Sequence, residues 1–241
     1  IAMGLAALHA EGVTAPVVVM DCDGEDRPED LPRLLAAHEQ HPGEIIFAQR
    51  AKRSEGHVFR LFYAIFKLIF GLLVGRNISF GNFCLIPPGL LRRVAYLQEI
   101  WNHFAAGIMH ARLPWRTIPT QRGRRYAGNS QMNLVALVLH GLSAISVYIE
   151  VVYVRLLFFA FILILLDVLA FLVLVYIRFG TPLAIPGWAT SVAVGLTVVM
   201  VQAVLFLALL SFVVLSTRSA KMFIPAVDYR DYLLKIERIT P

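Results

Sequence analysis

The sequence predicts an α/β protein in which a domain of alternating strands and helices is followed by a two-helix transmembrane hairpin. In the first half of the 241 residues, short apolar runs such as 15–20 are separated by helical segments, a pattern typical of a mostly parallel sheet. The second half contains two apolar stretches long enough to cross a bilayer. Hydrophobic residues make up 58% of the chain, above the roughly half expected of a soluble domain, and the excess lies after residue 130.

The elements of the α/β domain follow one another in a regular order. Residues 1–11 are rich in alanine and predict a helix, and residues 15–20 predict a buried strand. Pro28 and the acidic residues after it mark the start of a helix that extends to about residue 40. The remaining expected elements are a strand over 44–48, an amphipathic helix over 57–74 suited to the bilayer interface, a strand over 79–86, helices over 89–97 and 99–111, and a strand over 115–120.

The first strand needs a neighbour, and no earlier strand precedes the helix over 1–11. We therefore expect the chain to lack its natural start. Cys22 and Cys84 are the only cysteines and have no metal-type spacing, which favours a reducing compartment without a disulfide framework.

Four segments are expected along the chain. The α/β domain occupies 1–130, and 131–155 is an apolar region interrupted by polar residues, which favours an interfacial amphipathic helix. Residues 156–217 hold two transmembrane helices, over about 156–177 and 189–216, and 218–241 form a tail.

The flanking charges predict the orientation of this hairpin. Arg155, Arg218 and Lys221 at its outer ends outweigh Arg178 in its loop. By the positive-inside rule, the α/β domain and both termini lie in the cytoplasm, and the protein is a multi-pass protein of the cell membrane.

Asp167 and Gln202 lie near the centres of the two predicted spans. A lone carboxylate in hydrocarbon is costly, so we expect either a hydrogen bond from Asp167 to Gln202 or contacts of Asp167 across a homo-oligomer interface.

Two carboxylates stand directly after the first predicted strand. Asp21 and Asp23 are one residue apart, and ligands of α/β sheets bind at the carboxyl ends of strands. Their oxygens, with Glu25 as a third ligand, suit Mg²⁺ or Mn²⁺. A solvated acidic turn would contain the same residue types, so this alternative stays open.

Basic residues are concentrated before residue 130, and the formal net charge is +6. This balance favours anionic lipid or a phosphorylated substrate; nucleic acid is not favoured, because the arginines lie in loops beside membrane segments. The expected phosphate ligands follow two strands: Arg50 and Arg53 after the second, and Arg125 with Ser130 after the last.

Four ordered segments carry a resemblance to a known family. Residues 21–25 (DCDGE) resemble a D-x-D-x-Q motif, and 47–53 (FAQRAKR) a mobile acceptor loop. Residues 81–85 (GNFCL) are similar to a G-D/N-F-x-L strand, and 125–131 (RYAGNSQ) to an R-x-x-G-x-S-K/R segment. Together they resemble the family 2 inverting glycosyltransferases, in the branch of dolichyl-phosphate mannose synthase and bacterial polyprenyl-phosphate glycosyltransferases. Three positions depart from the family pattern: Glu25 replaces Gln, Asn82 stands where many relatives have Asp, and Gln131 replaces Lys or Arg.

The resemblance implies a GT-A-like domain, partial because its first βα units are missing. It implies a metal-dependent hexosyltransferase that moves a sugar with inversion from a nucleotide-sugar donor to undecaprenyl or dolichyl phosphate in the bilayer. Asp21 and Asp23 would be the catalytic metal ligands. Since the missing units should hold the base and ribose, we expect calorimetry to show no tight donor binding to the chain as it stands. The residues implied in phosphate and acceptor binding are Arg50, Arg53, Asn82, Arg125 and Ser130.

Two other functions remain open at this point. Processive polysaccharide synthases carry Q-x-x-R-W, which residues 121–125 match in part but without the Trp. A membrane-anchored scaffold without catalytic activity would also explain an α/β domain that lacks its nucleotide-binding start.

Overall fold

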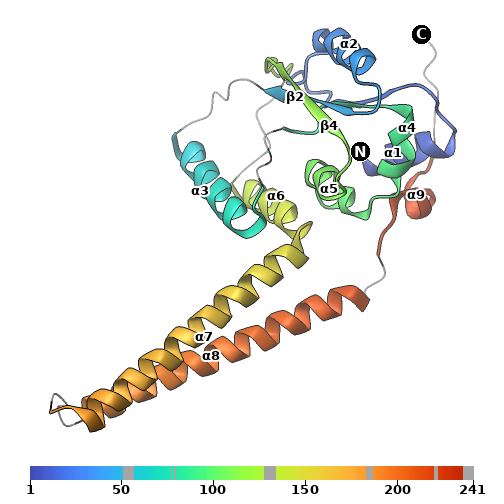
Figure 1. The fold of residues 1–241 in the computed structure, drawn as a ribbon. Coiled ribbons are helices and arrows are strands. Elements are labelled where there is room, and N and C mark those ends of the chain that lie inside the picture. The colour runs from blue at the N-terminus through green and yellow to red at the C-terminus, as the bar shows by residue number, and fades with distance from the viewer. Residues whose placement is uncertain are drawn as a thin grey trace. The chain divides into compact units, whose positions relative to one another are not determined.

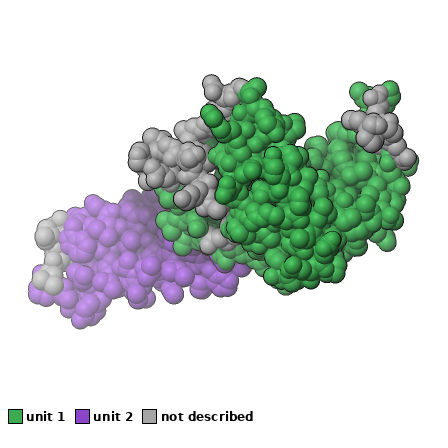
Figure 2. All heavy atoms as spheres, turned by 90° about the horizontal axis from the view of Figure 1, so that it is seen from above, with its two compact units in different colours: residues 1–148, 222–241 green, residues 149–221 purple. Residues whose placement is uncertain are grey.

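The computed structural model describes residues 1–50, 57–76, 78, 80–127, 134–182, 187–219 and 222–235. They belong to two compact units, coloured separately in Figure 2. The first unit combines residues 1–148 with the segment from 222 to the end of the chain, and the second unit is 149–221.

The first unit is built on a four-stranded sheet with the order β1-β3-β2-β4. Figure 1 labels the neighbouring strands β2 and β4. β2 and β4 are parallel, whereas β3 runs antiparallel to both β1 and β2. The predicted α/β class is confirmed, but the expectation of a mostly parallel sheet is wrong, because β3 opposes the other three strands. The strands are β1 (Val17–Val19), β2 (Ile45–Arg50), β3 (Cys84–Ile86) and β4 (Trp115–Thr120).

The reversal of β3 has a topological cause. A parallel neighbour of β2 would need a crossover helix packed on the sheet. The helix in that position, α3 (His57–Val74), instead makes its main helix contact with α6 (Leu134–Ser146). β3 therefore begins at the edge of the sheet where β2 ends, and it runs antiparallel to β2.

Apolar side chains alternate between the two faces of the sheet, as strand geometry requires. Ile45 and Phe47 face one cluster with residues of α1 (Ala2–Ala10), α4 (Pro88–Ala95) and α5 (Phe104–His110). Ile46 and Ala48 face the other cluster, with Leu34 of α2 (Leu31–Gln40). A 3-10 turn, η1 (Pro28–Asp30), leads into α2 where Pro28 predicts a helix start.

The predicted helix over 99–111 is divided into η2 (Gln98–Trp101) and α5. The break is at His103, whose extended backbone and ring make it the N-cap of α5: its Nδ1 accepts a hydrogen bond from Ala106 N at 3.2 Å. This places His103 and Asn102 at a junction rather than inside a helix.

The end of the chain is part of the first unit. Here α9 (Pro225–Asp228) and η3 (Tyr229–Tyr232) contact α1, and the rings of Phe223 and Tyr232 lie 4.6 and 5.8 Å from that of Trp101. The segment predicted as a tail thus helps to cover the α/β fold.

α3 and α6 lie together in the first unit. A Cβ at Gly141 of α6 would lie 2.7 Å from the Phe66 ring of α3, so this glycine permits the close contact. Both helices also expose apolar side chains, as expected of interfacial helices. The exposed set is Ile65, Leu68, Ile69, Leu72, Val135, Val138, Leu139 and Leu142.

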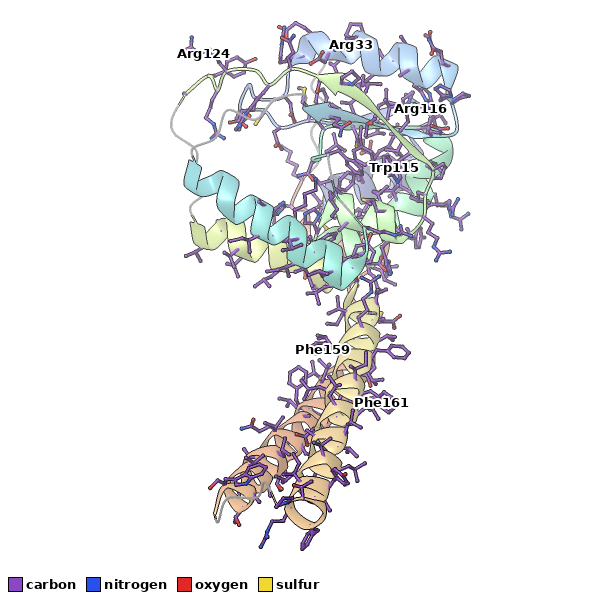
Figure 3. All side chains as sticks on the ribbon, turned by 60° about the vertical axis from the view of Figure 1, so that its left-hand side comes forward. Arg33, Trp115, Arg116, Arg124, Phe159 and Phe161 are labelled. Carbon is purple, nitrogen blue, oxygen red and sulfur yellow. The ribbon has the colours of Figure 1, made fainter. Side chains whose placement is uncertain are left out.

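The second unit is a hairpin of α7 (Ile149–Gly180) and α8 (Trp188–Ser219). Each helix is long and apolar enough to cross a membrane, as predicted, although α7 starts before the predicted boundary at residue 156. Apolar side chains cover its outside; Phe159 and Phe161, labelled in Figure 3, are both more than half exposed.

The predicted hydrogen bond from Asp167 to Gln202 is wrong. Asp167 is buried, but its Oδ2 has no hydrogen-bond partner among the described residues, and Gln202 lies on an exposed face of α8. The hydrogen bond between Tyr153 and Ser211 sets the register of the hairpin. Counting from it places Asp167 level with Thr197, about 7.5 Å along the axis from Gln202 at 1.5 Å per residue. The alternative of an oligomer contact stays a prediction.

Candidate functional site

Two loops meet at the edge of the sheet where β1, β2 and β4 end. The loop after β1 pairs with the loop after β4 through two backbone hydrogen bonds: Gly123 N donates to Glu25 O, and Tyr126 N donates to Asp23 O, both at 2.9 Å. β1 and β4 are the outer strands of the sheet, so only the loops bring these residues together.

Glycine makes this pairing possible on both sides. Gly24 has a φ of +90°, and a Cβ there would lie 2.8 Å from Arg124 O and 2.9 Å from the Tyr126 ring. A Cβ at Gly123 would collide with Gly24 O. The two loops therefore approach as closely as their backbones allow.

We predict that Gly24→Ala separates the two loops. The positive φ and the contact with Arg124 O should together destabilise the first unit by about 2 kcal/mol. Thermal unfolding measures this loss. Gly43→Ala is the matched control, because no atom lies within 4 Å of a Cβ at that position. Equal unfolding temperatures for the two variants would contradict the predicted role of Gly24.

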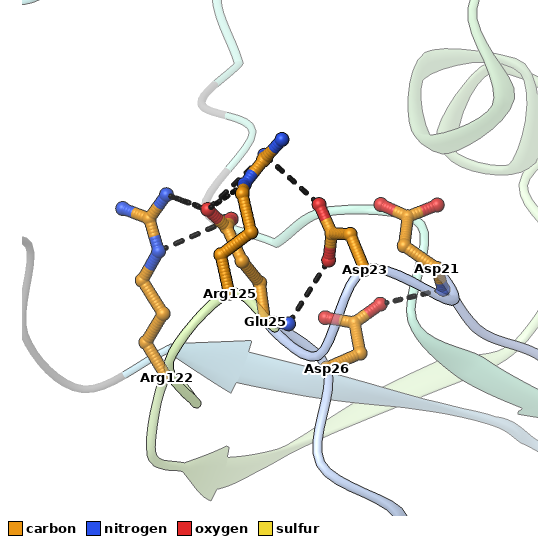
Figure 4. A network of polar contacts seen from close by, with 6 residues as sticks. All are labelled: Asp21, Asp23, Glu25, Asp26, Arg122 and Arg125. Carbon is orange, nitrogen blue, oxygen red and sulfur yellow. Dashed lines mark hydrogen bonds and ion pairs between the residues drawn. The ribbon is translucent and has the colours of Figure 1, made fainter. Parts of the chain in front are cut away.

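Carboxylates and guanidinium groups form an ion-pair network between the loops (Figure 4). Arg122 binds both oxygens of Glu25, the shortest distance being 2.7 Å. Arg125 bridges Asp23 at 2.9 Å and Glu25 at 3.3 Å. Hydrogen bonds within the acidic loop fix its shape: Asp23 Oδ1 accepts from Glu25 N at 2.9 Å, and Asp26 Oδ2 accepts from Asp21 N at 3.0 Å.

The ion-pair network determines the ionisation and the partners of Glu25. The hydrogen bond from Arg122 lowers the pKa of this carboxyl against the opposing effect of burial, and Arg125 lowers it further. Glu25 is therefore an ionised partner of two arginines. Within the described part of the chain, no group of three or more His, Cys, Asp or Glu side chains surrounds a metal position, so the expected third ligand role of Glu25 is not supported.

Asp21 and Asp23 still fit a divalent cation by their chemistry. Mg²⁺ is commonly held by one or two carboxylates together with substrate phosphates and water, and it does not need a complete protein cage. Both aspartates follow β1 directly, and Asp21 is exposed to solvent. They could hold a cation that a diphosphate shares.

Of the other predicted site residues, some lie near this edge of the sheet and some lie outside the described part of the chain. Arg50 is the last residue of β2, opposite Thr120 of β4, so its backbone lies at the same edge. β1 pairs with β3 from Val17 with Ile86 to Val19 with Cys84, so Asp21 and Asn82 each lie two residues beyond the last pair, at the same end of the pairing. The predicted residues outside the described part of the chain are Arg53 and Ser130.

A cavity of about 270 Å³ adjoins Asn82. His103, 8% exposed, lies in its wall, and the ring of His140 from α6 lies 4.4 Å from that of His103. Burial, and then the nearby His140, lower the pKa of His103 to about 4. Burial also lowers the pKa of His140, so both rings are neutral at neutral pH. The sequence places His103 and Asn102 within one turn but does not predict this cavity.

We predict that His103 makes the first unit less stable in acid. An unfolded histidine protonates near pH 6.5, whereas His103 in the folded protein protonates near pH 4. The contribution of the neutral His103 to the free energy of unfolding is therefore complete above pH 6.5 and is lost as the pH falls toward 4. The loss at pH 5 should be about 2 kcal/mol. Unfolding temperatures at pH 7 and pH 5 measure it. His103→Asn, which can still cap α5, should reduce the difference, and His41→Asn should not; an unchanged difference in His103→Asn would refute the assignment.

No protein-family model matches the chain, and no curated protein is significantly similar to it.

Proposed function

We propose that the chain is part of a membrane-bound, GT-A-like glycosyltransferase that moves a sugar from a nucleotide-sugar donor to polyprenyl phosphate with inversion. One observation carries the proposal: the acidic loop after β1 and the arginine loop after β4 meet at one sheet edge through Asp23, Glu25, Arg122 and Arg125. Opposite charges of this kind suit a diphosphate and the cation that accompanies it.

The acidic side of the site would hold the cation. Asp21 and Asp23 are the proposed ligands of Mg²⁺ or Mn²⁺, which when bound neutralises charge on the leaving nucleoside diphosphate. The hydrogen bond that Asp23 Oδ1 accepts from Glu25 N and the one that Asp21 N donates to Asp26 Oδ2 keep both residues in fixed positions before the donor arrives. Preorganised groups of this kind lower the cost of reaching the transition state.

The basic side would hold phosphate. Arg122 and Arg125 present forked donors that match phosphate as well as carboxylate. In the structure Arg122 binds Glu25 and Arg125 binds Asp23, so a bound phosphate would replace some of these carboxylate contacts. The acceptor phosphate is anionic at neutral pH and can attack directly, so the chemistry rests on positioning.

The apolar surfaces fit a lipid acceptor. α3 and α6 expose apolar side chains, and α7 and α8 are each long enough to cross a membrane. The chain leaves the first unit at α7 and returns to it after α8, so both ends of the hairpin belong on one membrane side. The flanking basic residues favour the cytoplasmic side. The acceptor phosphate would then lie at headgroup depth.

A transfer assay tests the proposal. The complete gene product, in nanodiscs, is incubated with labelled UDP-glucose or GDP-mannose and undecaprenyl phosphate, with Mn²⁺ or with EDTA. We expect a lipid product with one sugar that EDTA abolishes. A polymeric product would support the processive synthase instead. Absence of transfer from every donor, together with absence of Mn²⁺-dependent binding of UDP or GDP, would leave the scaffold function and overturn the proposal.

A further inference from the structure

The carboxylate of Glu25 is shared by two arginines of the loop after β4. Arg122 binds it along one edge of the guanidinium group, with Nη2 at 2.8 Å from Oε1 and Nε at 3.2 Å from Oε2. Nη2 of Arg125 approaches the same Oε1 at 3.3 Å, so the carboxylate lies between the two cations (Figure 4). Like charges at such a separation repel one another. Glu25 therefore holds two cations side by side that would otherwise move apart.

Glu25 is also the most buried member of this trio. Its side chain is 13% exposed, whereas those of Arg122 and Arg125 are 29% and 26% exposed. Its main chain is fixed by two hydrogen bonds: Gly123 N donates to Glu25 O, and Glu25 N donates to Asp23 Oδ1. A ligand that arrives from solvent would thus contact the guanidinium groups before it could displace the carboxylate beneath them.

Arg125 has a second carboxylate partner that a cation would remove. Asp23 binds Arg125 at 2.9 Å, and its side chain is 32% exposed. Asp23 is a proposed cation ligand, so a bound cation would compete with Arg125 for its oxygens. Glu25 would then remain as the carboxylate that keeps Arg125 next to Arg122.

We propose that Glu25 is a positioning residue that holds Arg122 and Arg125 as a pair for the terminal phosphate of the donor's diphosphate. The proposal rests on the proposed function, because it assigns the ligand of this pair within the proposed donor site. A guanidinium group carries several N–H donors, so it can bind a carboxylate along one edge and a phosphate along another.

The terminal phosphate is the part of the donor on which charge develops. When an oxygen of the acceptor phosphate forms its bond to the sugar carbon, the bond from that carbon to the terminal phosphate oxygen breaks. The oxygen keeps the electron pair, and the leaving diphosphate gains one negative charge. Two cations held in position before the reaction stabilise such a charge without reorganising.

A second effect of Glu25 opposes this one. A carboxylate repels phosphate, so removing its charge would by itself strengthen phosphate binding. Arg122 and Arg125 cover Glu25 and are each more than a quarter exposed, so the two cations and water screen this repulsion. Ordering two long side chains that Glu25 no longer holds has the larger cost, because each arginine has many rotamers to lose. The net effect of removing the carboxylate should be weaker phosphate binding.

The affinity ratio of nucleoside diphosphate to monophosphate tests the proposal. Calorimetry on the complete gene product at saturating Mn²⁺ compares UDP with UMP and GDP with GMP, so that each pair differs by the terminal phosphate. In the unchanged protein, the diphosphate should bind about 100-fold more tightly than its monophosphate, and Glu25→Gln should reduce this ratio to about tenfold. A merely structural role would weaken mono- and diphosphate alike.

Two further variants separate charge from position. Glu25→Asp keeps the negative charge but is one methylene shorter, so it cannot hold both guanidinium groups, and the ratio should fall here too. Glu44→Gln is the matched control, because Glu44 accepts hydrogen bonds from Arg116 at 2.9 and 3.3 Å at the opposite end of β4. Its ratio should be unchanged.

A protein without the two arginines shows whether Glu25 acts through them. In the Arg122→Ala, Arg125→Ala background, Glu25→Gln should leave the ratio as it is. A further reduction in that background, or a ratio that does not fall in either Glu25→Gln or Glu25→Asp, would overturn the proposal while the proposed function stands. A reduction that disappears as the Mn²⁺ concentration is raised would make Glu25 a cation ligand and also overturn it. Absence of Mn²⁺-dependent binding of UDP and GDP to the unchanged protein would overturn the proposed function itself.

Discussion

Asp23→Asn should abolish sugar transfer and leave the fold intact. Asp23 has two separate contacts: Oδ1 accepts from Glu25 N, and Oδ2 binds Arg125. Asparagine can keep the first contact because its amide oxygen is also an acceptor. It loses the negative charge with which Asp23 would bind a divalent cation. Since a catalytic cation supplies several kcal/mol to the transition state, we expect transfer to fall by about 10³-fold or more.

The matched control is Glu29→Gln. Glu29 is an exposed carboxylate in η1 that forms an ion pair with Arg27 at 3.5 Å, so it tests the loss of one negative charge a few residues away. Transfer by this variant should stay within about twofold of the unchanged protein. Unfolding temperatures of both variants should be unchanged within a few degrees. Transfer by Asp23→Asn at more than one-tenth of the normal rate would exclude Asp23 as a cation ligand.

The local patterns of the sequence predict most of the elements of the first unit. The β-branched run at 17–19 and the apolar run from Ile45 form strands because they can be buried on a sheet. Pro28 marks the start of the turn that leads into α2. The direction of β3 could not be predicted in this way, because strand direction depends on whether the preceding helix crosses the sheet, and α3 packs against α6 instead.

The candidate site shows the same division between local and long-range information. The sequence predicts Asp21 and Asp23 as a pair because their spacing and their position after a strand are local properties. The ion pair of Asp23 with Arg125 depends on a contact across about 100 residues of sequence, which no spacing encodes. For Asp167, the apolar pattern predicts the depth in the membrane but not the direction of the side chain, since that depends on the register of the two helices.

Arg125→Ala should have opposite effects on cation and donor. Arg125 neutralises Asp23 and Glu25 in the structure, at 2.9 and 3.3 Å. Without it, the two carboxylates attract Mn²⁺ more strongly, so Mn²⁺ alone should bind several-fold more tightly. The donor would lose a charge-assisted hydrogen bond worth about 1.5–3 kcal/mol, so KM for the nucleotide sugar should rise by about tenfold or more.

These opposite effects distinguish a phosphate ligand from a residue that only supports the acidic loop. If Arg125 merely held the loop in place, its loss would weaken the binding of Mn²⁺ and of the donor together. Arg116→Ala is the matched control, because Arg116 forms a comparable ion pair with Glu44 at 2.9 Å but lies at the opposite end of β4, and both constants should be unchanged. Arg125→Lys should recover the charge without the fork, so its KM should lie between those of the unchanged protein and Arg125→Ala. The pairing of Arg125 with Asp23 would then be the state of the site before the donor binds, which the diphosphate replaces with its own contacts.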